Sequence, residues 1–220
     1  MASERAGGGA GDPAASPLCA LLPGGRIRPG TAVSTGGDMP LLLALAAEAS
    51  AGTAGWAAVG LPHLGALAAE SAGLDLRGGL RVDRPGRHVV QVLATLIEAA
   101  PVVLAGPLDR VSDRAARRLT AALRRSGSIL LSSGPLPGAE IRMRVVSASW
   151  EGVGEGHGLL HGRRVRIAAT GRGAAAAPRY AEMWLPGPSG AAAPVRDAVD
   201  AAPDGVPAPT GLRPELRAAG

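Results

Sequence analysis

Residues 31–43 read TAVSTGGDMPLLL, and this stretch sets the first elements of the fold. Residues 31–35 predict a short strand, and the glycine pair after them predicts a turn. Residues 40–51 predict a helix, in which Pro40 is acceptable at the first turn. A strand, a glycine-rich turn and a helix in this order form the frame in which a phosphate-binding loop is found.

Short apolar segments alternate with helical patterns after this stretch. One helical segment, residues 113–125, follows Ser112, which is a suitable N-cap. Three strand-like segments joined by glycine-rich turns end the series. The order predicts an α/β fold with a mainly parallel sheet flanked by helices and an antiparallel C-terminal extension. The predicted strands are 56–61, 80–82, 102–105, 128–132, 141–150, 163–170 and 180–185, and the further helices are 64–72 and 89–99.

The two ends of the chain differ in composition from its centre. Residues 1–17 are rich in glycine and alanine, and residues 188–220 are rich in proline and alanine. Such segments contain few large apolar side chains, so we expect a disordered lead and a disordered tail. The segment between them, residues 18–187, is the predicted folded domain. With 46% hydrophobic residues, the chain has enough apolar side chains for a buried core.

Composition excludes several classes of protein. The single cysteine, Cys19, excludes an internal disulfide framework. The apolar run 41–47 is too short to span a bilayer, and the N-terminus lacks a signal pattern, so we expect a cytoplasmic protein without a membrane partner. All 23 basic residues are arginines, which excludes a catalytic or phosphate-binding lysine. Only four aromatic rings argue against a platform that stacks single-stranded bases.

The turn at residues 36–43 departs from a working phosphate-binding loop. Counted from Gly36, the Gly-Lys-Ser/Thr positions hold Leu41, Leu42 and Leu43. Asp38 adds a negative charge where phosphate would lie. The strand at 102–105, where a magnesium-holding carboxylate is expected, is followed by alanine, glycine and proline. We therefore predict no cofactor, no metal and no catalytic residue; the degenerate loop comprises Gly36, Gly37, Asp38, Leu42 and Leu43.

Several stretches together resemble a known family. They are LLPGGRIRPGTAVSTGG, WAAVGLPHLGALAAESAGLDLRGGLRV, VVQVLATLIEAAPVVLAG and RMRVVSASWEGVGEGHGLLHGRRVRIAATGR…RYAEMWLPG. Over residues 21–187, their order and spacing resemble degenerate RecA-like proteins of the actinobacterial ImuA-prime type, accessory proteins of mutagenesis cassettes. The resemblance implies a RecA-like core, with Leu61 where RecA has its catalytic glutamate.

The resemblance also implies partners. ImuA-prime-like proteins act with ImuB, an inactive relative of Y-family polymerases, and through it with an error-prone DnaE-type polymerase and a sliding clamp. The expected function is a non-catalytic adaptor in damage-induced translesion synthesis. Two alternatives stay open: a RecA-like ATPase with an unconventional loop, and a protein that binds DNA directly.

Arginine-rich segments are the candidate contacts for a partner or for DNA. A helix with exposed arginines is often only a solvated face, and alternation along strands would place several arginines on one sheet face. Reversing the charge of Arg118 and Arg125 by substitution with glutamate is expected to weaken assembly with the ImuB-like partner, unless the strand arginines named below form the interface. His157 and His161 lie in a glycine-rich segment that predicts a turn rather than a metal site. The candidates are Arg117, Arg118, Arg124 and Arg125 in the helix, and Arg163, Arg164 and Arg166, with Arg142 and Arg144, in the strands.

Overall fold

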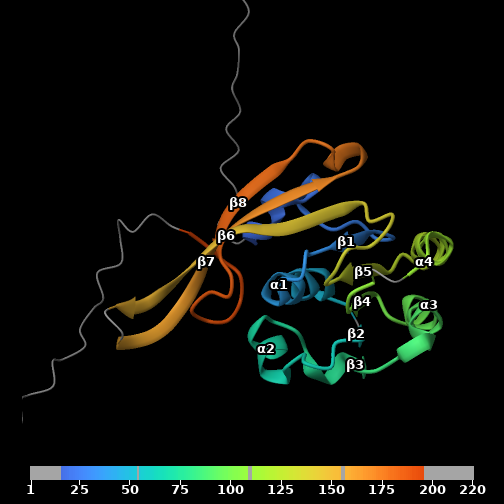
Figure 1. Ribbon diagram of the computed structural model, residues 1–220, viewed down its shortest axis with the longest axis horizontal. Helices are drawn as coiled ribbons and strands as arrows, with labels where there is room; N and C mark the ends of the chain where they lie inside the picture. Colours follow the sequence, from blue (N-terminus) through green and yellow to red (C-terminus); the bar gives the residue numbers. More distant parts are fainter. Residues whose placement is uncertain (1–15, 54, 109–110, 155–156, 196–220) are drawn as a thin grey trace, which may run out of the picture.

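One sheet organises the protein (Figure 1). The computed structural model describes residues 16–53, 55–108, 111–154 and 157–195. The strand order in the sheet is β3-β2-β4-β5-β1-β6-β7-β8-β9. The strands are β1 (Ala32–Ser34), β2 (Trp56–Val59), β3 (Gly79–Val82), β4 (Val102–Ala105), β5 (Ile129–Ser132), β6 (Ile141–Gly154), β7 (His157–Gly171), β8 (Arg179–Trp184) and β9 (Ala193–Pro194).

Pairing directions divide this sheet into two parts. In the order of the sheet, each neighbouring pair from β3 across to β6 is parallel, and each pair from β6 across to β9 is antiparallel. Helices connect the parallel strands: α1 (Met39–Ser50), α2 (Ala66–Ser71), α3 (Val89–Ala99) and α4 (Asp113–Ser126). This arrangement confirms the predicted α/β class, with a mainly parallel sheet flanked by helices and an antiparallel C-terminal extension.

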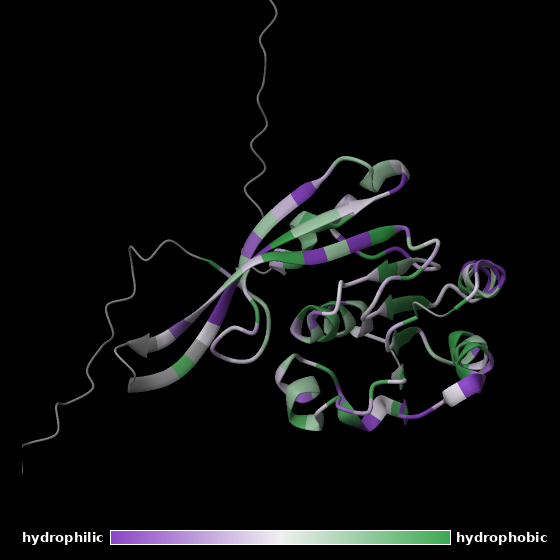
Figure 2. Cartoon of the chain, viewed as in Figure 1, coloured by the Kyte–Doolittle hydropathy of each residue, from purple (hydrophilic) through white to green (hydrophobic). Residues whose placement is uncertain are grey.

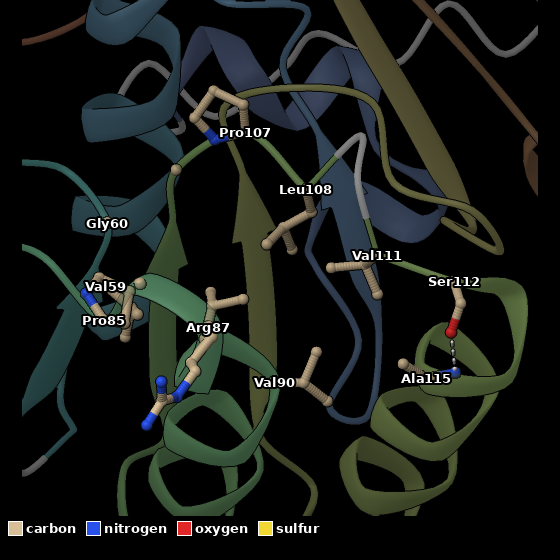
Figure 3. Close-up of a pocket in the computed structure, with 13 residues that line it drawn as sticks. Val59, Gly60, Pro85, Arg87, Val90, Pro107, Leu108, Val111, Ser112 and Ala115 are labelled. Atoms are coloured by element: carbon tan, nitrogen blue, oxygen red, sulfur yellow. Dashed lines mark hydrogen bonds between the residues drawn. The ribbon is translucent and has the colours of Figure 1, made fainter.

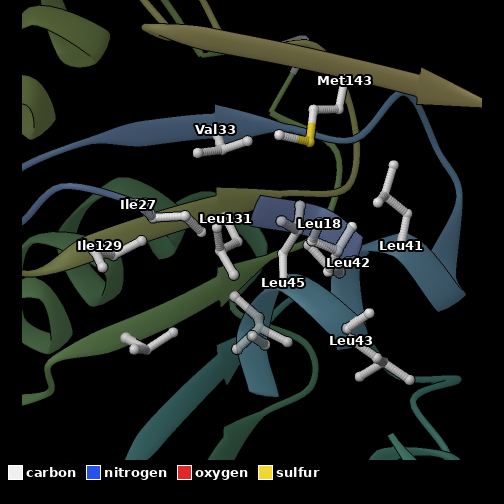
Figure 4. Packing of buried hydrophobic residues seen from close by; sticks show 14 of the residues in the cluster. Leu18, Ile27, Val33, Leu41, Leu42, Leu43, Leu45, Ile129, Leu131 and Met143 are labelled. Atoms are coloured by element: carbon white, nitrogen blue, oxygen red, sulfur yellow. The ribbon is translucent and has the colours of Figure 1, made fainter. Parts of the chain in front are cut away.

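The first buried cluster lies between the sheet and α1 (Figure 4). Val33 of β1, Leu131 of β5 and Met143 of β6 face this cluster. Leu41 and Leu42 of α1 are fully buried, and Leu18 of the short 3-10 helix η1 (Pro17–Leu21) packs into the same cluster. Because this cluster includes residues of β6, β7 and β8, it joins the parallel and antiparallel parts of the sheet.

The second cluster lies on the opposite face, under α3 and α4. Leu93 and Ile97 of α3 pack there with Leu119 and Leu123 of α4. Ser112 caps α4 by accepting a hydrogen bond from Ala115 N, as the sequence predicts. None of the buried residues of this cluster belongs to β6, β7 or β8. On the α3–α4 side, the helix-covered area therefore ends near β1.

The β6–β7 hairpin is longer than the sequence predicts. The glycine-rich segment 156–162 was expected to be a turn, but β7 begins at His157, so that expectation is wrong. The pairing of β6 with β7 is shifted between Val145 and Ser147 and again between Glu151 and Val153, and the second shift lies at Gly152. The far end of the hairpin projects away from α1 and α2 (Figure 1).

The described fold also extends past the predicted domain boundaries. Ser16 caps η1, so two residues of the expected lead belong to the fold. The expected start of the tail at residue 188 is corrected too, since β9 pairs with β8. Proline is tolerated in β9 because this strand forms the sheet edge. Residues 1–15 and 196–220, the rest of the expected lead and tail, lie outside the described residues.

Candidate functional site

The first part of the degenerate loop, at residues 35–38, is held closed by hydrogen bonds to the end of β5. It follows β1, which lies between β5 and β6. Thr35 N donates to Ser132 O over 2.9 Å, and Gly37 N donates to Ser133 O. Gly36 and Gly37 have φ values of 64° and 94°, a backbone conformation that favours glycine. These bonds use backbone groups that a phosphate-binding loop would direct at its ligand.

Asp38 occupies the position at which a helix N-terminus would bind a phosphate. Its Oδ1 accepts a hydrogen bond from Leu41 N over 3.0 Å and so caps α1. Its Oδ2 accepts a hydrogen bond from Arg163 Nη1 over 2.7 Å. The Asp38 and Arg163 side chains are only 13% and 15% exposed. A carboxylate from the chain itself therefore supplies the anion that this helix end favours.

The leucines of the loop motif point into the core instead of toward a ligand. Leu41 and Leu42 are fully buried, and Leu43 is 3% exposed. Figure 4 shows Leu41, Leu42 and Leu43 among the packed side chains of the first cluster. Gly36, Gly37 and Asp38 thus form the loop itself, whereas Leu42 and Leu43 serve the hydrophobic core.

Close contact between β2 and β4 fills the place where the magnesium-holding carboxylate is expected. Gly106, just after β4, donates from its N to Val59 O over 2.8 Å. A Cβ at residue 106 would clash with the carbonyl oxygen of Gly60. Leu61, at the position of the catalytic glutamate, is 6% exposed. The carboxyl ends of these two strands pack together too closely for a side chain at residue 106.

A cavity of about 580 Å³ lies beside these strand ends, between α3 and α4 (Figure 3). Its walls are mostly apolar and include Val59, Val90, Leu108 and Val111. Arg87 also lines it, but its Nε donates to His88 Nε2 over 3.1 Å. Without converging polar groups, this cavity shows no reaction chemistry. Among the described residues, no group of three or more His, Cys, Asp or Glu side chains is arranged to hold a metal ion.

The arginines of α4 differ in whether they form ion pairs. Arg124 Nη2 lies 3.9 Å from Glu140 Oε1, and Arg125 Nη2 lies 3.0 Å from Glu98 Oε1 on α3. Arg117 and Arg118 are exposed and form no ion pair with a described residue. The four candidates of this helix are therefore not equivalent as contact residues.

The strand cluster also divides. Arg163 pairs with Asp38 and is nearly buried, so its guanidinium group contacts a carboxylate of the chain itself. Arg164 and Arg166 are exposed on the other face of β7. Arg164 Nη2 lies 3.0 Å from Glu182 Oε2, and Arg166 Cζ lies 5.1 Å from the centroid of the Tyr180 ring. The alternation of side chains along β7 places Arg163 on one sheet face and Arg164 and Arg166 on the other. The pairing of Arg163 with Asp38 has no local signal in the sequence.

The fold and the loop define an α/β protein whose strand–turn–helix element is closed by backbone hydrogen bonds and by the Asp38–Arg163 ion pair. A family model described as the MT3502 N-terminal domain matches residues 20–138, and the chain belongs to this family. The chain is also similar to "Uncharacterized protein Rv3395c" of Mycobacterium tuberculosis (strain ATCC 25618 / H37Rv). The two are 33% identical over 163 residues, which cover 69% of this chain and 80% of that protein.

Within the described ranges, none of the helices combines the length and the apolar character that a bilayer crossing needs.

Proposed function

We propose that this protein is a non-catalytic RecA-like adaptor in a cytoplasmic, DNA-damage-induced translesion synthesis complex. Its expected partners are an ImuB-like inactive polymerase relative and, through it, an error-prone DnaE-type polymerase and a sliding clamp. The identity of the complex rests on the sequence resemblance. The non-catalytic role rests on one structural observation, the Asp38 carboxylate that caps α1 and pairs with Arg163.

The electrostatics of the loop support this proposal. A nucleotide phosphate placed at the start of α1 would meet the Asp38 carboxylate, and like charges at hydrogen-bond distance repel strongly when they are shielded from water. The cation that lies beside Asp38, Arg163, already pairs with that carboxylate. Phosphoryl transfer also needs a metal ion that bridges the phosphates and a group that orients the attacking water. Leu61 and Gly106, which stand at the expected places, supply neither group.

Nucleotide binding and partner binding test the two halves of the proposal. The full-length chain is heated with and without millimolar ATP–magnesium, and we expect no change in Tm and no hydrolysis above background. A saturable rise in Tm that disappears in Gly37→Ala would instead establish an ATP site. For the partner, the tagged chain is recovered from damage-treated host cells; absence of an ImuB-like protein from the bound fraction would overturn the adaptor proposal.

Direct DNA binding is the second candidate function, because Arg117, Arg118, Arg142 and Arg144 are exposed. Phosphate contacts by arginine release counterions, so such binding must weaken steeply as salt increases. Tight, salt-dependent binding of duplex or single-stranded DNA by the isolated chain would favour this candidate. Binding of DNA only in the presence of the partner would favour the adaptor.

A further inference from the structure

The sheet face formed by β6, β7 and β8 on the α3–α4 side has no helix over it. The buried cluster beneath α3 and α4 takes none of its members from these strands. On the other face of the same strands, Met143, Val165 and Met183 are buried in the first cluster. Alternating hydrophilic and hydrophobic bands mark these strands in Figure 2. One face of this part of the sheet is therefore core, and the other is open.

Arginines concentrate on the open face. Arg142 and Arg144 alternate with the buried Ile141 and Met143 along β6 and are exposed. In the register of the sheet, Arg144 lies beside Ala168, which lies beside Tyr180. Arg166 belongs to the adjacent row, opposite Glu182. The open face thus carries Arg142, Arg144, Arg164 and Arg166, with Glu182 opposite Arg166 and Glu151 one row beyond Arg164.

The charge on this face is greatest at β6. Glu182 pairs with Arg164, and Arg166 lies over the Tyr180 ring. Arg142 and Arg144 form no ion pair with a described residue. Two neighbouring guanidinium groups repel each other, and an added carboxylate or phosphate removes this repulsion. Each guanidinium group can then donate paired hydrogen bonds to the anion, so binding of an anion is favourable at Arg142 and Arg144.

A cavity of about 500 Å³ adjoins these two arginines. Ser34 and Gly36 line one part of it, and Leu136 and Pro137 line another, so the cavity combines apolar walls with two cationic side chains. The closed loop packs directly against β6 at this cavity, because a Cβ at Gly36 would lie 3.3 Å from Arg144 Cβ. We call this surface, Arg142 and Arg144 with the adjoining cavity, the β6 groove.

We propose that the β6 groove binds an acidic, partly apolar segment of a partner protein. This inference rests on the proposed adaptor function and assigns that function its docking surface. Carboxylates of the segment pair with Arg142 and Arg144, while an apolar side chain enters the cavity beside Leu136. A protein segment fits better than single-stranded nucleic acid, because base stacking needs several free aromatic faces. Two aromatic rings, Tyr180 and Trp184, lie on this face. Arg166 already covers Tyr180, and the half-buried Trp184 packs against Gly162.

Binding of a defined probe tests the groove independently of the natural partner. The probe is a fluorescent synthetic peptide of alternating glutamate and leucine, compared with an oligothymidine of equal net charge. We expect the full-length chain to bind the peptide more tightly than the oligothymidine. Arg142→Glu/Arg144→Glu should weaken peptide binding by about tenfold or more, and Arg142→Lys/Arg144→Lys should retain part of it.

The matched control is Arg117→Glu/Arg118→Glu, which reverses two exposed arginines of α4 and should leave peptide binding unchanged. Equal loss in both double variants would show a general charge effect and overturn the assignment. Tighter binding of oligothymidine that is lost in Arg142→Glu/Arg144→Glu would overturn the protein segment as occupant. An unchanged Tm of each variant shows that it is folded.

Co-purification with the ImuB-like protein separates the inference from the proposed function. If the wild-type chain does not bind that protein, the adaptor proposal fails, and the peptide result alone decides whether the groove binds acidic segments. If the wild type binds and Arg142→Glu/Arg144→Glu binds equally well, the adaptor proposal stands and the groove is wrong.

Discussion

Arg163 Nη1 donates a hydrogen bond to Asp38 Oδ2 over 2.7 Å, although 125 residues separate the two in sequence. The contact links the start of α1 to β7 and therefore joins the parallel and antiparallel parts of the sheet. It also fills the helix end that would bind an anion. One ion pair thus stabilises the fold and closes the loop.

Asp38→Ala should lower the free energy of unfolding by about 3 kcal/mol, because it removes a helix cap and leaves Arg163 nearly buried without its carboxylate. Asp38→Asn should cost less, since asparagine retains the cap. Urea denaturation monitored by circular dichroism measures both. Asp75→Ala is the control: Asp75 caps a short exposed 3-10 helix and has no cationic partner among the described residues, so its loss should stay below about 1 kcal/mol. Equal losses for Asp38→Ala and Asp75→Ala would contradict a stabilising role for the ion pair.

Two truncations distinguish the edge strand from the residues beyond it. Ending the chain after Gly187 removes β9 and the hydrogen bond from Gly187 N to Ala191 O, so Tm should fall by about 5 °C. Ending it after Val195 retains every described contact and should leave Tm nearly unchanged. Differential scanning calorimetry compares both with the full-length chain. If both truncations melt like the full-length chain, β9 contributes nothing to stability.

Gly106→Ala should lower the free energy of unfolding by about 3 kcal/mol, because the added Cβ clashes with the carbonyl oxygen of Gly60 and neither backbone can move without disturbing β2 or β4. Gly65→Ala is the matched control, since its Cβ would lie 3.8 Å from Ala68 Cβ. We expect a change below about 1 kcal/mol there. Chemical denaturation of both variants measures the difference, and similar stabilities would show that β2 and β4 can separate at this end.

Burial raises the pKa of the Cys19 thiol above its ordinary value, and the Glu48 carboxylate, whose Oε1 lies 3.8 Å from Sγ, adds to the rise. The folded state holds this proton more tightly than the unfolded state. Stability should therefore fall as pH rises past the ordinary thiol pKa, where the unfolded chain ionises first. Alkylation by iodoacetamide should reach half its maximal rate at a higher pH than for free cysteine.

Glu48→Gln should remove part of that rise in pKa and leave the part that burial causes. Cys19→Ser should abolish both the alkylation and the associated fall in stability. A pH profile of alkylation identical to that of free cysteine would contradict the raised pKa.

Local patterns in the sequence predict most of the parallel part of the fold. Apolar spacing identifies α3 at the residues the structure gives, and Ser112 marks the start of α4 because an N-cap acts within one turn. The buried strand β4 follows from four consecutive apolar residues. These signals are readable because each depends on neighbours in the sequence.

Contacts between distant segments are not readable in this way. Nothing near Arg163 indicates that it reaches Asp38, and nothing near Gly36 indicates that Arg144 lies beside it. The sequence does identify the loop as degenerate, since Leu41–Leu43 replace the required residue types. It does not identify what fills the loop, because that depends on the register of β7 against the rest of the sheet.

The place of β1 in the sheet sets the order in which the chain can fold during its synthesis. Val33 pairs with Leu131 on one side and with Ile141 on the other, so β1 has no lasting neighbour until both later segments have left the ribosome. Until then the leucines of α1 have no sheet to cover them, and they remain accessible to chaperones. Nascent chains that end before residue 129 should therefore be cleaved readily by protease within residues 31–50, whereas release of the β6 segment should protect this region.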